Sequence, residues 1–265
     1  MTMYMQRMYV TVLATFIIGF MGCDSGQKSN SHPGVLWEKG KLLASENFSN
    51  NLNEWMSEGA VVAEIENGKL RFESLAHDTL KVERGNIWWK KRFEGPILIE
   101  YEYRSATQHG LSMVWWFAHS RNDTALLEQQ RTGDYKEYIV GNMNGYHISY
   151  HRNDSRKTNF RKSYGFHLLS SVVDPVPLKD TSRHTIQIYS QENRFRFLVD
   201  GELVHTFTDT GQPCMMGDQW VHEGPCKGTG KPFTNGYIGF RHINEQVAYY
   251  DNLKVYRLLK PEAAK

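Results

Sequence analysis

The sequence has few cysteines, almost no net charge and no apolar run long enough to cross a membrane comfortably. Only three of its 265 residues are cysteine, and they form neither a Cys-x-x-Cys pair nor a Cys/His spacing typical of zinc. The formal net charge is +2, so nothing in the composition indicates a polyanion such as nucleic acid as a partner. We therefore expect no cofactor and no metal centre, and leave a structural calcium ion open.

The first 23 residues are typical of an export signal rather than of a folded domain. Arg7 supplies positive charge, and the apolar run that follows it is shorter than the roughly 20 residues that span a bilayer. The run ends in Gly22-Cys23, the arrangement of a bacterial lipoprotein cleavage site, so we expect Cys23 to be lipidated. The alternative is an ordinary secretory signal with an incidental cysteine. Residues 24–34 are polar and predict a flexible tether.

This N-terminal signal predicts that the protein is exported and held by a lipid anchor in a bacterial membrane, on the outer-membrane or periplasmic side. The remaining cysteines, Cys214 and Cys226, lie in one loop-rich stretch. In an oxidising compartment they are expected to form a disulfide, which would stabilise the fold by roughly 3 kcal/mol on the chain-entropy argument. Two free thiols are the alternative.

Residues 35–260 predict one all-β domain, with 40% hydrophobic and 13% aromatic residues available for a core. Apolar and polar residues alternate in several short segments, as in half-buried strands, and one segment is apolar throughout, as in a central strand. The expected strands are 69–74, 97–104, 111–117, 184–190, a hairpin within 194–209 around Asp200-Gly201, 237–242 and 247–258. The only helical candidate is a short one at 124–130.

Many strands separated by turn signals, with almost no helix, indicate a sandwich or a barrel. The end of the chain narrows this choice. Its Gly-x-x-Gly-Phe-Arg strand, short turn and aromatic strand resemble the closing hairpin of concanavalin-A-like jelly rolls. We therefore expect a jelly-roll β-sandwich of two antiparallel sheets, a fold in which one sheet curves into a groove where sugars bind.

Potentially reactive side chains are concentrated between residues 131 and 167. Residues 145–152 have the character of a strand, with His147 and His151 at odd positions and Tyr150 and Arg152 at even positions. Side chains alternate across a strand, so these two sets are expected to face opposite ways. Arg, His, Tyr and Asn side chains that converge on one surface suit an anionic, hydroxyl-rich ligand, which points to sugar acids.

His147 and Tyr150 are the main candidates for proton transfer. A histidine exchanges protons near neutral pH, and a tyrosine can do so when cations lower its pKa. They are three residues apart, so they share a site only if a bulge turns one of them. His167 is a further candidate for proton transfer, in place of one of these two. A hydrogen-bonded structural histidine and a core tyrosine are the alternative interpretations.

Candidates for substrate binding surround this pair. Arg131, Arg152 and Arg161 can each hold a carboxylate or sulfate by paired hydrogen bonds, although a single arginine is more often part of a surface ion pair. Trp115 and Trp116 face opposite ways, so one is expected in the core and one in the groove. The substrate-binding set that we predict is Arg131, Tyr138, Asn144, Arg152, Arg161 and Trp116.

Three blocks of the sequence together resemble the YesU-like family of bacterial proteins associated with polysaccharide breakdown. They are GLSMVWWFA at 110–118, RTGDYKEYIVGNMNGYHISYHR at 131–152 and NFRKSYGFHLLSSVVDPVP at 159–177. The resemblance implies a concanavalin-like sandwich. It also implies an activity, because relatives look like oligosaccharide dehydratases that act on uronic acids from the algal polysaccharide ulvan.

The function that we expect is therefore β-elimination on a uronic-acid-containing oligosaccharide, by a carbon–oxygen lyase that forms an unsaturated uronate. Two alternatives stay open. One is a non-catalytic carbohydrate-binding lipoprotein. The other is a glycoside hydrolase, which needs two carboxyl groups that flank the bond. The expected partners are an anionic oligosaccharide and, through the lipid anchor, a membrane.

Overall fold

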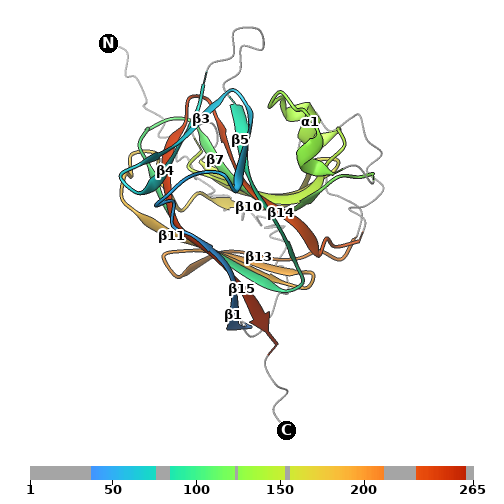
Figure 1. Ribbon diagram of the computed structural model, residues 1–265. Coiled ribbons are helices and arrows are strands. Elements are labelled where there is room, and N and C mark those ends of the chain that lie inside the picture. The colour runs from blue at the N-terminus through green and yellow to red at the C-terminus, as the bar shows by residue number, and fades with distance from the viewer. Residues whose placement is uncertain (1–36, 76–83, 123–124, 153–155, 212–230, 261–265) are drawn as a thin grey trace, which may run out of the picture. The chain divides into compact units, whose positions relative to one another are not determined.

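The computed structural model describes residues 37–75, 84–122, 125–152, 156–211 and 231–260 (Figure 1). The predicted signal, tether and lipidation site at Cys23 lie outside these residues, and so do Cys214 and Cys226. Among the helices of the described ranges, none is long and apolar enough to cross a membrane.

Two antiparallel sheets make up this part of the chain. The first sheet runs in the order β13 (Glu202–Thr208), β12 (Arg194–Val199), β11 (His184–Gln191), β6 (Ile97–Ser105), β15 (Val247–Leu259), β4 (Lys69–Ser74) and β3 (Val61–Glu66), with β1 (Glu38–Glu46) also paired to β15. The second sheet runs in the order β10 (His167–Val173), β9 (Lys157–Ser163), β8 (Asn144–Tyr150), β7 (Leu111–His119), β14 (Asn235–Ile243), β5 (Arg84–Glu94) and β2 (Trp55–Gly59).

The core lies between the sheets because alternate residues of each strand are apolar. On β6, Ile99 and Tyr101 face inward, and on β8 Ile148 and Tyr150 meet them from the other sheet. Aromatic rings fill much of this space, and the rings of Phe240 and Tyr250 stack with their centroids 4.1 Å apart. The predicted jelly-roll sandwich of two antiparallel sheets is confirmed.

Helical structure is confined to two short pieces that follow β7. The 3-10 helix η1 (Leu126–Glu128) falls inside the segment for which a short helix was expected. The α-helix α1 (Tyr135–Ile139) was not predicted, and it begins where the Asp134 carboxylate accepts a hydrogen bond from the Lys136 backbone N–H at 2.8 Å. Figure 1 shows α1 above the second sheet, on the side turned away from the first sheet.

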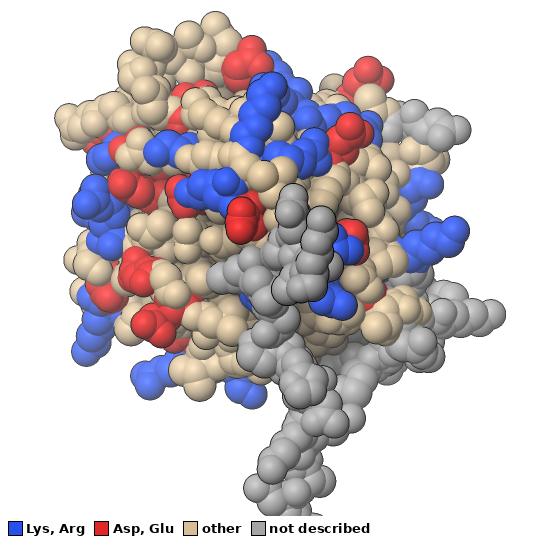
Figure 2. All heavy atoms as spheres, turned by 90° about the horizontal axis from the view of Figure 1, so that it is seen from below, with Lys and Arg blue, Asp and Glu red and all other residues tan. Residues whose placement is uncertain are grey.

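The outer face of the first sheet carries acidic and basic side chains in pairs. From below, blue and red side chains are interspersed over the molecule (Figure 2). The ion pairs on these strands are Lys39–Glu100, Lys69–Asp251, Arg71–Glu64, Arg71–Glu73 and Arg183–Glu102. Their side chains are partly solvated, so each is expected to contribute little to stability, about 0–1 kcal/mol.

A buried lysine on β9 bonds to both sides of the stretch 212–230. Lys162 Nζ lies 2.7 Å from Asp209 Oδ2 and donates a second hydrogen bond to the Lys231 carbonyl at 2.9 Å. The Tyr146 hydroxyl donates to the same Asp209 oxygen at 2.6 Å and accepts from the Phe233 N–H at 3.0 Å. The described residues just before and just after 212–230 are therefore held at one point of the sandwich.

Candidate functional site

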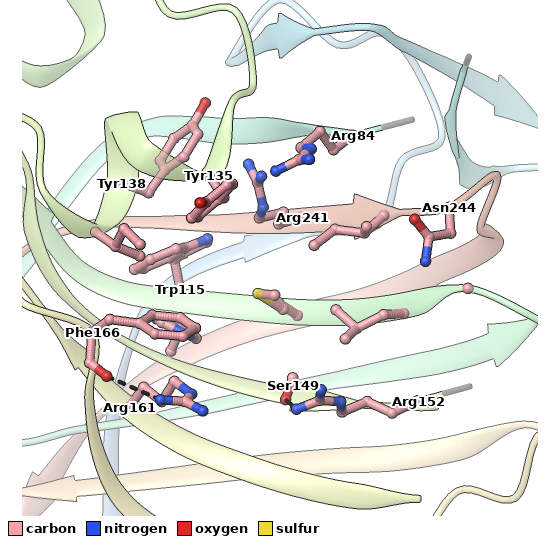
Figure 3. A pocket seen from close by; sticks show the side chains of 16 residues that line it. Arg84, Trp115, Tyr135, Tyr138, Ser149, Arg152, Arg161, Phe166, Arg241 and Asn244 are labelled. Atoms are coloured by element: carbon pink, nitrogen blue, oxygen red, sulfur yellow. Dashed lines mark hydrogen bonds between the residues drawn. The ribbon is translucent and has the colours of Figure 1, made fainter. Parts of the chain in front are cut away.

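A pocket of about 330 Å³ lies on the face of the second sheet that is turned away from the first sheet (Figure 3). The second sheet forms its floor, and α1 and the segments that flank the strands form its walls. The polar and aromatic side chains of its lining include Arg84, Trp115, Tyr135, Tyr138, His147, Ser149, Arg152, Arg161, Phe166 and Arg241. The lining contains no Asp or Glu among the residues that the structure describes.

The register of the second sheet explains why these residues meet. His147 on β8 pairs with Arg161 on β9 and with Trp115 on β7. One row along, Ser149 on β8 pairs with Met113 on β7, which in turn pairs with Arg241 on β14. Residues directly opposite one another in a sheet point to the same face, so these rows cover the pocket floor.

Arg241 is the most deeply placed cation of the pocket. Its side chain is 2% exposed, donates to the Gly133 carbonyl from Nη2 at 2.8 Å, and lies 4.4 Å from the centre of the Tyr138 ring. Burial lowers the pKa of Arg241, and the like charge of Arg84 lowers it further. Arg84 stands over the Tyr135 ring at 5.2 Å, so α1 and the two arginines form one wall.

Arg161 and Arg152 lie at the other side of the pocket. Arg161 stacks on Phe166, with its guanidinium 3.9 Å from the ring centre, and donates to the Phe166 carbonyl at 3.0 Å. β8 ends at Tyr150, and the φ of His151 is 50°, so the chain turns there. That turn brings Arg152 to the pocket, although its even number placed it on the other face of a continuous strand.

His147 lies between the arginines and is almost fully buried, with 2% of its surface exposed. Its ring centre is 4.1 Å from that of Trp115, and its Nδ1 has no hydrogen-bond partner in the described part of the chain. Burial lowers the pKa of His147 well below its usual value, and the charges of Arg161, Arg241 and Arg152 lower it further. The imidazole is therefore neutral at pH 7 in the free protein.

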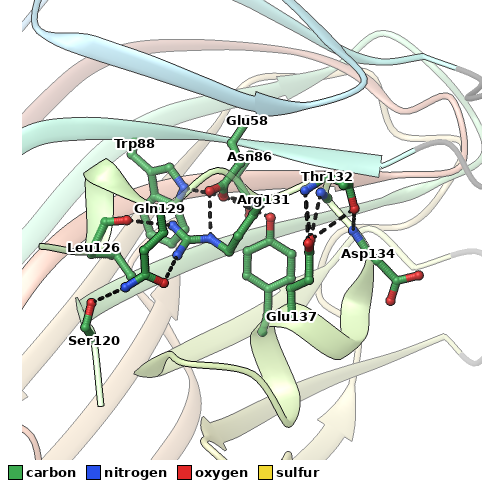
Figure 4. Close-up of polar contacts among 12 residues, drawn as sticks. Glu58, Asn86, Trp88, Ser120, Leu126, Gln129, Arg131, Thr132, Asp134 and Glu137 are labelled. Atoms are coloured by element: carbon green, nitrogen blue, oxygen red, sulfur yellow. Dashed lines mark hydrogen bonds and ion pairs between the residues drawn. The ribbon is translucent and has the colours of Figure 1, made fainter. Parts of the chain in front are cut away.

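Beneath one end of the pocket, a buried carboxylate organises the surrounding side chains (Figure 4). Glu58 Oε1 lies 2.6 Å from Arg131 Nε, and Glu58 Oε2 accepts from Trp88 Nε1 at 2.8 Å and from the Tyr138 hydroxyl at 2.9 Å. Burial raises the pKa of Glu58, and the charge of Arg131 opposes that rise. Glu58 thereby ties α1 to the second sheet.

The loop that leads into α1 also requires a glycine. Gly133 has a φ of +93°, and a Cβ there would lie 2.6 Å from the Arg84 carbonyl oxygen. Glu137 folds back to accept from the N–H groups of Thr132 and Gly133 at 2.9 and 3.1 Å. These contacts hold the loop, and with it Tyr135, against the edge of the sheet.

The structure places half of the predicted substrate-binding set at the pocket. Arg152, Arg161 and the ring of Tyr138 line it, as does His147. Arg131 does not, because its guanidinium is held in the ion pair with Glu58. Asn144 lies outside the lining too, with its amide nitrogen 3.2 Å from His119 Nε2.

Two further predicted residues face the sandwich interior instead of the pocket. The Tyr150 hydroxyl lies 2.9 Å from that of Tyr101 in the core, and burial raises the pKa of Tyr150 well above its usual value. Trp116 packs on Tyr146 and Phe160, so the tryptophan at the pocket is Trp115. The assignment of Trp116 to the groove is thus corrected.

His167 also lies away from the pocket. It pairs with Lys162 across β9 and β10, and therefore shares the face of Lys162, opposite to that of Arg161. A joint site of His147 with Tyr150 or His167 does not form, because the sheet separates their side chains. Alternation had predicted this separation for His147 and Tyr150 in the absence of a bulge.

Arg84, Arg241 and Tyr135 line the pocket but were not among the predicted site residues. Arg241 belongs to the Gly-x-x-Gly-Phe-Arg strand, which was interpreted for its fold alone. Its alternation with the buried Phe240 was the available signal, since it places Arg241 on the outer face. Within the described ranges, no group of three or more His, Cys, Asp or Glu side chains is placed to hold a metal ion.

Fold and pocket together define a jelly-roll β-sandwich protein with an arginine-lined pocket on one sheet. Residues 41–255 match the family described as "Domain of unknown function (DUF1961)", and the chain belongs to that family. The protein named "Uncharacterized protein YesU" from Bacillus subtilis (strain 168) is 26% identical over 219 residues, which cover 79% of this chain and 92% of that protein. The predicted membership of a YesU-like family is confirmed.

Solved structures agree on the fold. A Bacillus subtilis protein of unknown function with a galectin-like fold superposes with a TM-score of 0.74 at 23% identity, covering 85% of this chain and all of that one (100%). A β-glucanase from Bacillus licheniformis superposes with a TM-score of 0.51 at 17% identity, covering 83% of this chain and 99% of the enzyme. A laminarinase from Flavobacterium sp. UMI-01 gives a TM-score of 0.51 at 17% identity, covering 82% and 100%.

Proposed function

We propose that the pocket binds a uronic-acid-containing oligosaccharide and catalyses β-elimination on it, forming an unsaturated uronate. The observation that carries the proposal is the composition of the lining. Four arginines surround a buried neutral histidine, and the described lining contributes no carboxylate. Such a site suits a carboxylate ligand and the removal of a proton next to it.

In this proposal Arg152 and Arg161 hold the uronate carboxylate. When the neighbouring C–H bond breaks, negative charge develops on that carboxylate, and the two guanidinium groups stabilise it. His147, which pairs with Arg161 across the β8–β9 ladder, accepts the proton. The carbon–carbon double bond forms as the C–O bond at the β-position breaks, and the departing oxygen needs a proton.

Tyr135 takes the role of acid that Tyr150 cannot fill from the core. It lines the pocket from α1, and Arg84 stands over its ring. A hydroxyl that departs with this proton leaves as water, so the enzyme is a dehydratase. A glycosidic oxygen that departs in the same way makes it a chain-cleaving lyase. We propose water as the leaving group, in line with the activity that the sequence resemblance implied.

The arginines also make His147 responsive to its ligand. Their charges lower the pKa of His147 in the free protein. A bound carboxylate offsets those charges, so the pKa of His147 rises when substrate is present. The histidine is then neutral before binding and a stronger base after it, as a general base near pH 7 requires.

The two alternatives receive less support. A glycoside hydrolase needs a pair of carboxyl groups at the bond, whereas Glu58 is held by Arg131, Trp88 and Tyr138 beneath the pocket. A non-catalytic carbohydrate-binding protein is favoured by one observation, the aromatic rings of Trp115, Tyr135 and Phe166 in the lining. Carbohydrate binding without catalysis, however, gives the buried His147 no role.

The test is incubation with a panel of uronate oligosaccharides, followed by mass spectrometry and ultraviolet absorbance. Loss of water together with a new absorbance of the conjugated uronate supports the dehydratase. Scission with that absorbance supports a chain-cleaving lyase, and scission with addition of water indicates a hydrolase. Binding without any change of mass, across the panel, contradicts the catalytic proposal and leaves carbohydrate binding.

We further propose that the protein is exported and anchored through a lipid on Cys23, with a Cys214–Cys226 disulfide. Replacement of Cys23 by Ser is expected to release the protein from membranes or to block its processing. Intact-mass measurement with and without reductant checks the disulfide. Alkylation of both thiols without reduction contradicts it.

A further inference from the structure

Two of the four pocket arginines do not hold the reacting carboxylate in the elimination proposed above. Arg161 on β9 and Arg152 at the end of β8 hold the carboxylate, whereas Arg84 and Arg241 come from β5 and β14. In the second sheet β9 and β14 are separated by β8 and β7, so the backbones at Arg161 and Arg241 are three strand spacings apart, roughly 14 Å. Figure 3 shows the two pairs on opposite sides of β7.

The setting of Arg241 indicates an anion-binding site of its own. Its guanidinium is buried next to the like charge of Arg84, an arrangement that is costly unless a negative group offsets it. Nη2 donates to the Gly133 carbonyl, but the buried Nη1 has no hydrogen-bond partner in the described residues. A buried donor of this kind is normally satisfied, so Nη1 is suited to a ligand oxygen.

The nearby carboxylates among the described residues act on these arginines through their charge, but their oxygens are bonded to other groups. Glu58 favours the charged form of Arg241, while its oxygens contact Arg131 at 2.6 Å and accept from Trp88 and Tyr138. Asp134 favours the charged form of Arg84, while its carboxylate caps α1 by accepting from the Lys136 N–H. Neither side chain lines the pocket.

We propose that Arg84 and Arg241 form a second anion subsite, and that the ligand carries anionic groups on two neighbouring sugar residues. The carboxylate at Arg152 and Arg161 belongs to the reacting uronate. The group at Arg84 and Arg241 is a carboxylate or a sulfate ester on the adjacent residue, with the sugar passing over Met113 and Leu111 of β7. This inference rests on the proposed function and names the substrate class for it.

The test uses selenate, an anomalous scatterer that stands in for sulfate. Crystals of the protein soaked in sodium selenate are expected to show one anion within hydrogen-bond distance of Arg84 and Arg241, and a second at Arg152 and Arg161. An empty Arg84–Arg241 position in the wild-type protein overturns the proposal, and this result does not depend on how any variant folds.

Variants then assign the two positions. Arg84→Gln is expected to lose the anion at Arg241 and to keep the one at Arg161, whereas the matched control Arg152→Gln shows the reverse. A lost charge-assisted hydrogen bond typically costs about 1.5–3 kcal/mol, so in Arg84→Gln the calorimetric affinity for sulfate at the second anion subsite should fall about tenfold or more. Equal occupancy in wild type and Arg84→Gln would mean an adventitious ion only, and overturns the proposal.

Competition by acetate at constant ionic strength distinguishes the two sources of the anion. Displacement of selenate from Arg84 and Arg241 by acetate assigns a carboxylate there, and retention assigns a sulfate ester. Elimination activity is read separately by ultraviolet absorbance. Active enzyme with an unoccupied second position refutes the subsite alone, whereas occupied positions without activity on any uronate refute the proposed function alone.

Discussion

The outer faces of the two sheets carry cations in opposite electrostatic settings. On the first sheet a basic side chain lies beside an acidic one, as in Lys39–Glu100 at 3.0 Å and Arg183–Glu102 at 3.2 Å. On the second sheet four arginines line one pocket, and its described lining contains no Asp or Glu. The formal net charge of +2 does not reveal this separation.

This contrast indicates which of the two faces is suited to bind an anionic ligand. A solvated ion pair satisfies both partners and is worth little to stability, about 0–1 kcal/mol. A buried cation next to another cation gains from a negative group supplied from outside the protein. The same residue type is therefore part of the solvated surface on one sheet and part of a candidate binding site on the other.

The largest expected effect concerns the base between the pocket arginines. On a confirmed substrate, His147→Ala should lower turnover by about 10²–10⁴-fold, because general acid–base groups typically contribute that much. Initial rates by ultraviolet absorbance measure the loss. Tyr150→Phe is the matched control from the other face of β8. It removes the hydroxyl contact with Tyr101, so turnover should persist while stability falls by about 1 kcal/mol. Wild-type turnover in His147→Ala contradicts the assignment.

A second experiment contrasts the buried ion pair beneath the pocket with a pair on the first sheet. Arg131→Met leaves the Glu58 carboxylate buried without its counter-charge, which should lower the free energy of unfolding by about 3–5 kcal/mol. Lys39→Met removes a partner of Glu100 on the first sheet and should cost about 0–1 kcal/mol. Urea denaturation compares the two. Equal losses of unfolding free energy in the two variants would contradict the expected difference between the buried ion pair and the solvated one.

A buried histidine between the two sheets, His205, is expected to make the folding stability depend on pH. Burial lowers the pKa of His205 to about 4 from 6.5, and its ring lies 2.9 Å from Ser170 Oγ. The unfolded chain therefore binds the proton more readily between these values. The contribution of the neutral His205 to the free energy of unfolding is therefore expected to be fully present above pH 6.5 and to be lost as the pH falls towards 4.

Urea midpoints at pH 7 and pH 5 measure this loss, and His205→Asn should reduce the difference between them. An unchanged difference in that variant would exclude His205 as a source. The interior histidine thus differs from the pocket histidine, whose pKa is expected to respond to ligand.

The smallest effect is expected for Arg183, whose side chain is 67% exposed just before β11 of the first sheet. Arg183→Gln should change the free energy of unfolding by no more than about 0.5 kcal/mol and leave sulfate affinity unaltered. Arg84→Gln, measured alongside, should lose sulfate affinity. A matching loss in both variants would show that the anion responds to overall charge rather than to the pocket.

The fold could be predicted from the sequence because its signals are local. Alternation identified β4 and β11, and the Asp200-Gly201 turn correctly marked the hairpin of β12 and β13. The helix α1 escaped prediction because it spans only residues Tyr135–Ile139, too short for a helical period to stand out.

The site was predicted only in part, and the reason is geometric. Alternation separates His147 from Tyr150 and Trp115 from Trp116, but it does not say which face of the strand meets the other sheet. Arg241 joins His147 only through the pairing of β14, β7 and β8, which local patterns do not encode. Candidates from one segment were therefore found, and those from distant strands were not.

The two bonds of Lys162 differ in how they respond to substitution. Asp209 and Lys231 stand on either side of residues 212–230 in the sequence, and one buried ammonium group contacts both. Since the contact at Lys231 is to a backbone carbonyl, it tolerates a change of side chain at that position. The contact at Asp209 is to the carboxylate, so a change there leaves the buried ammonium group of Lys162 without its counter-charge.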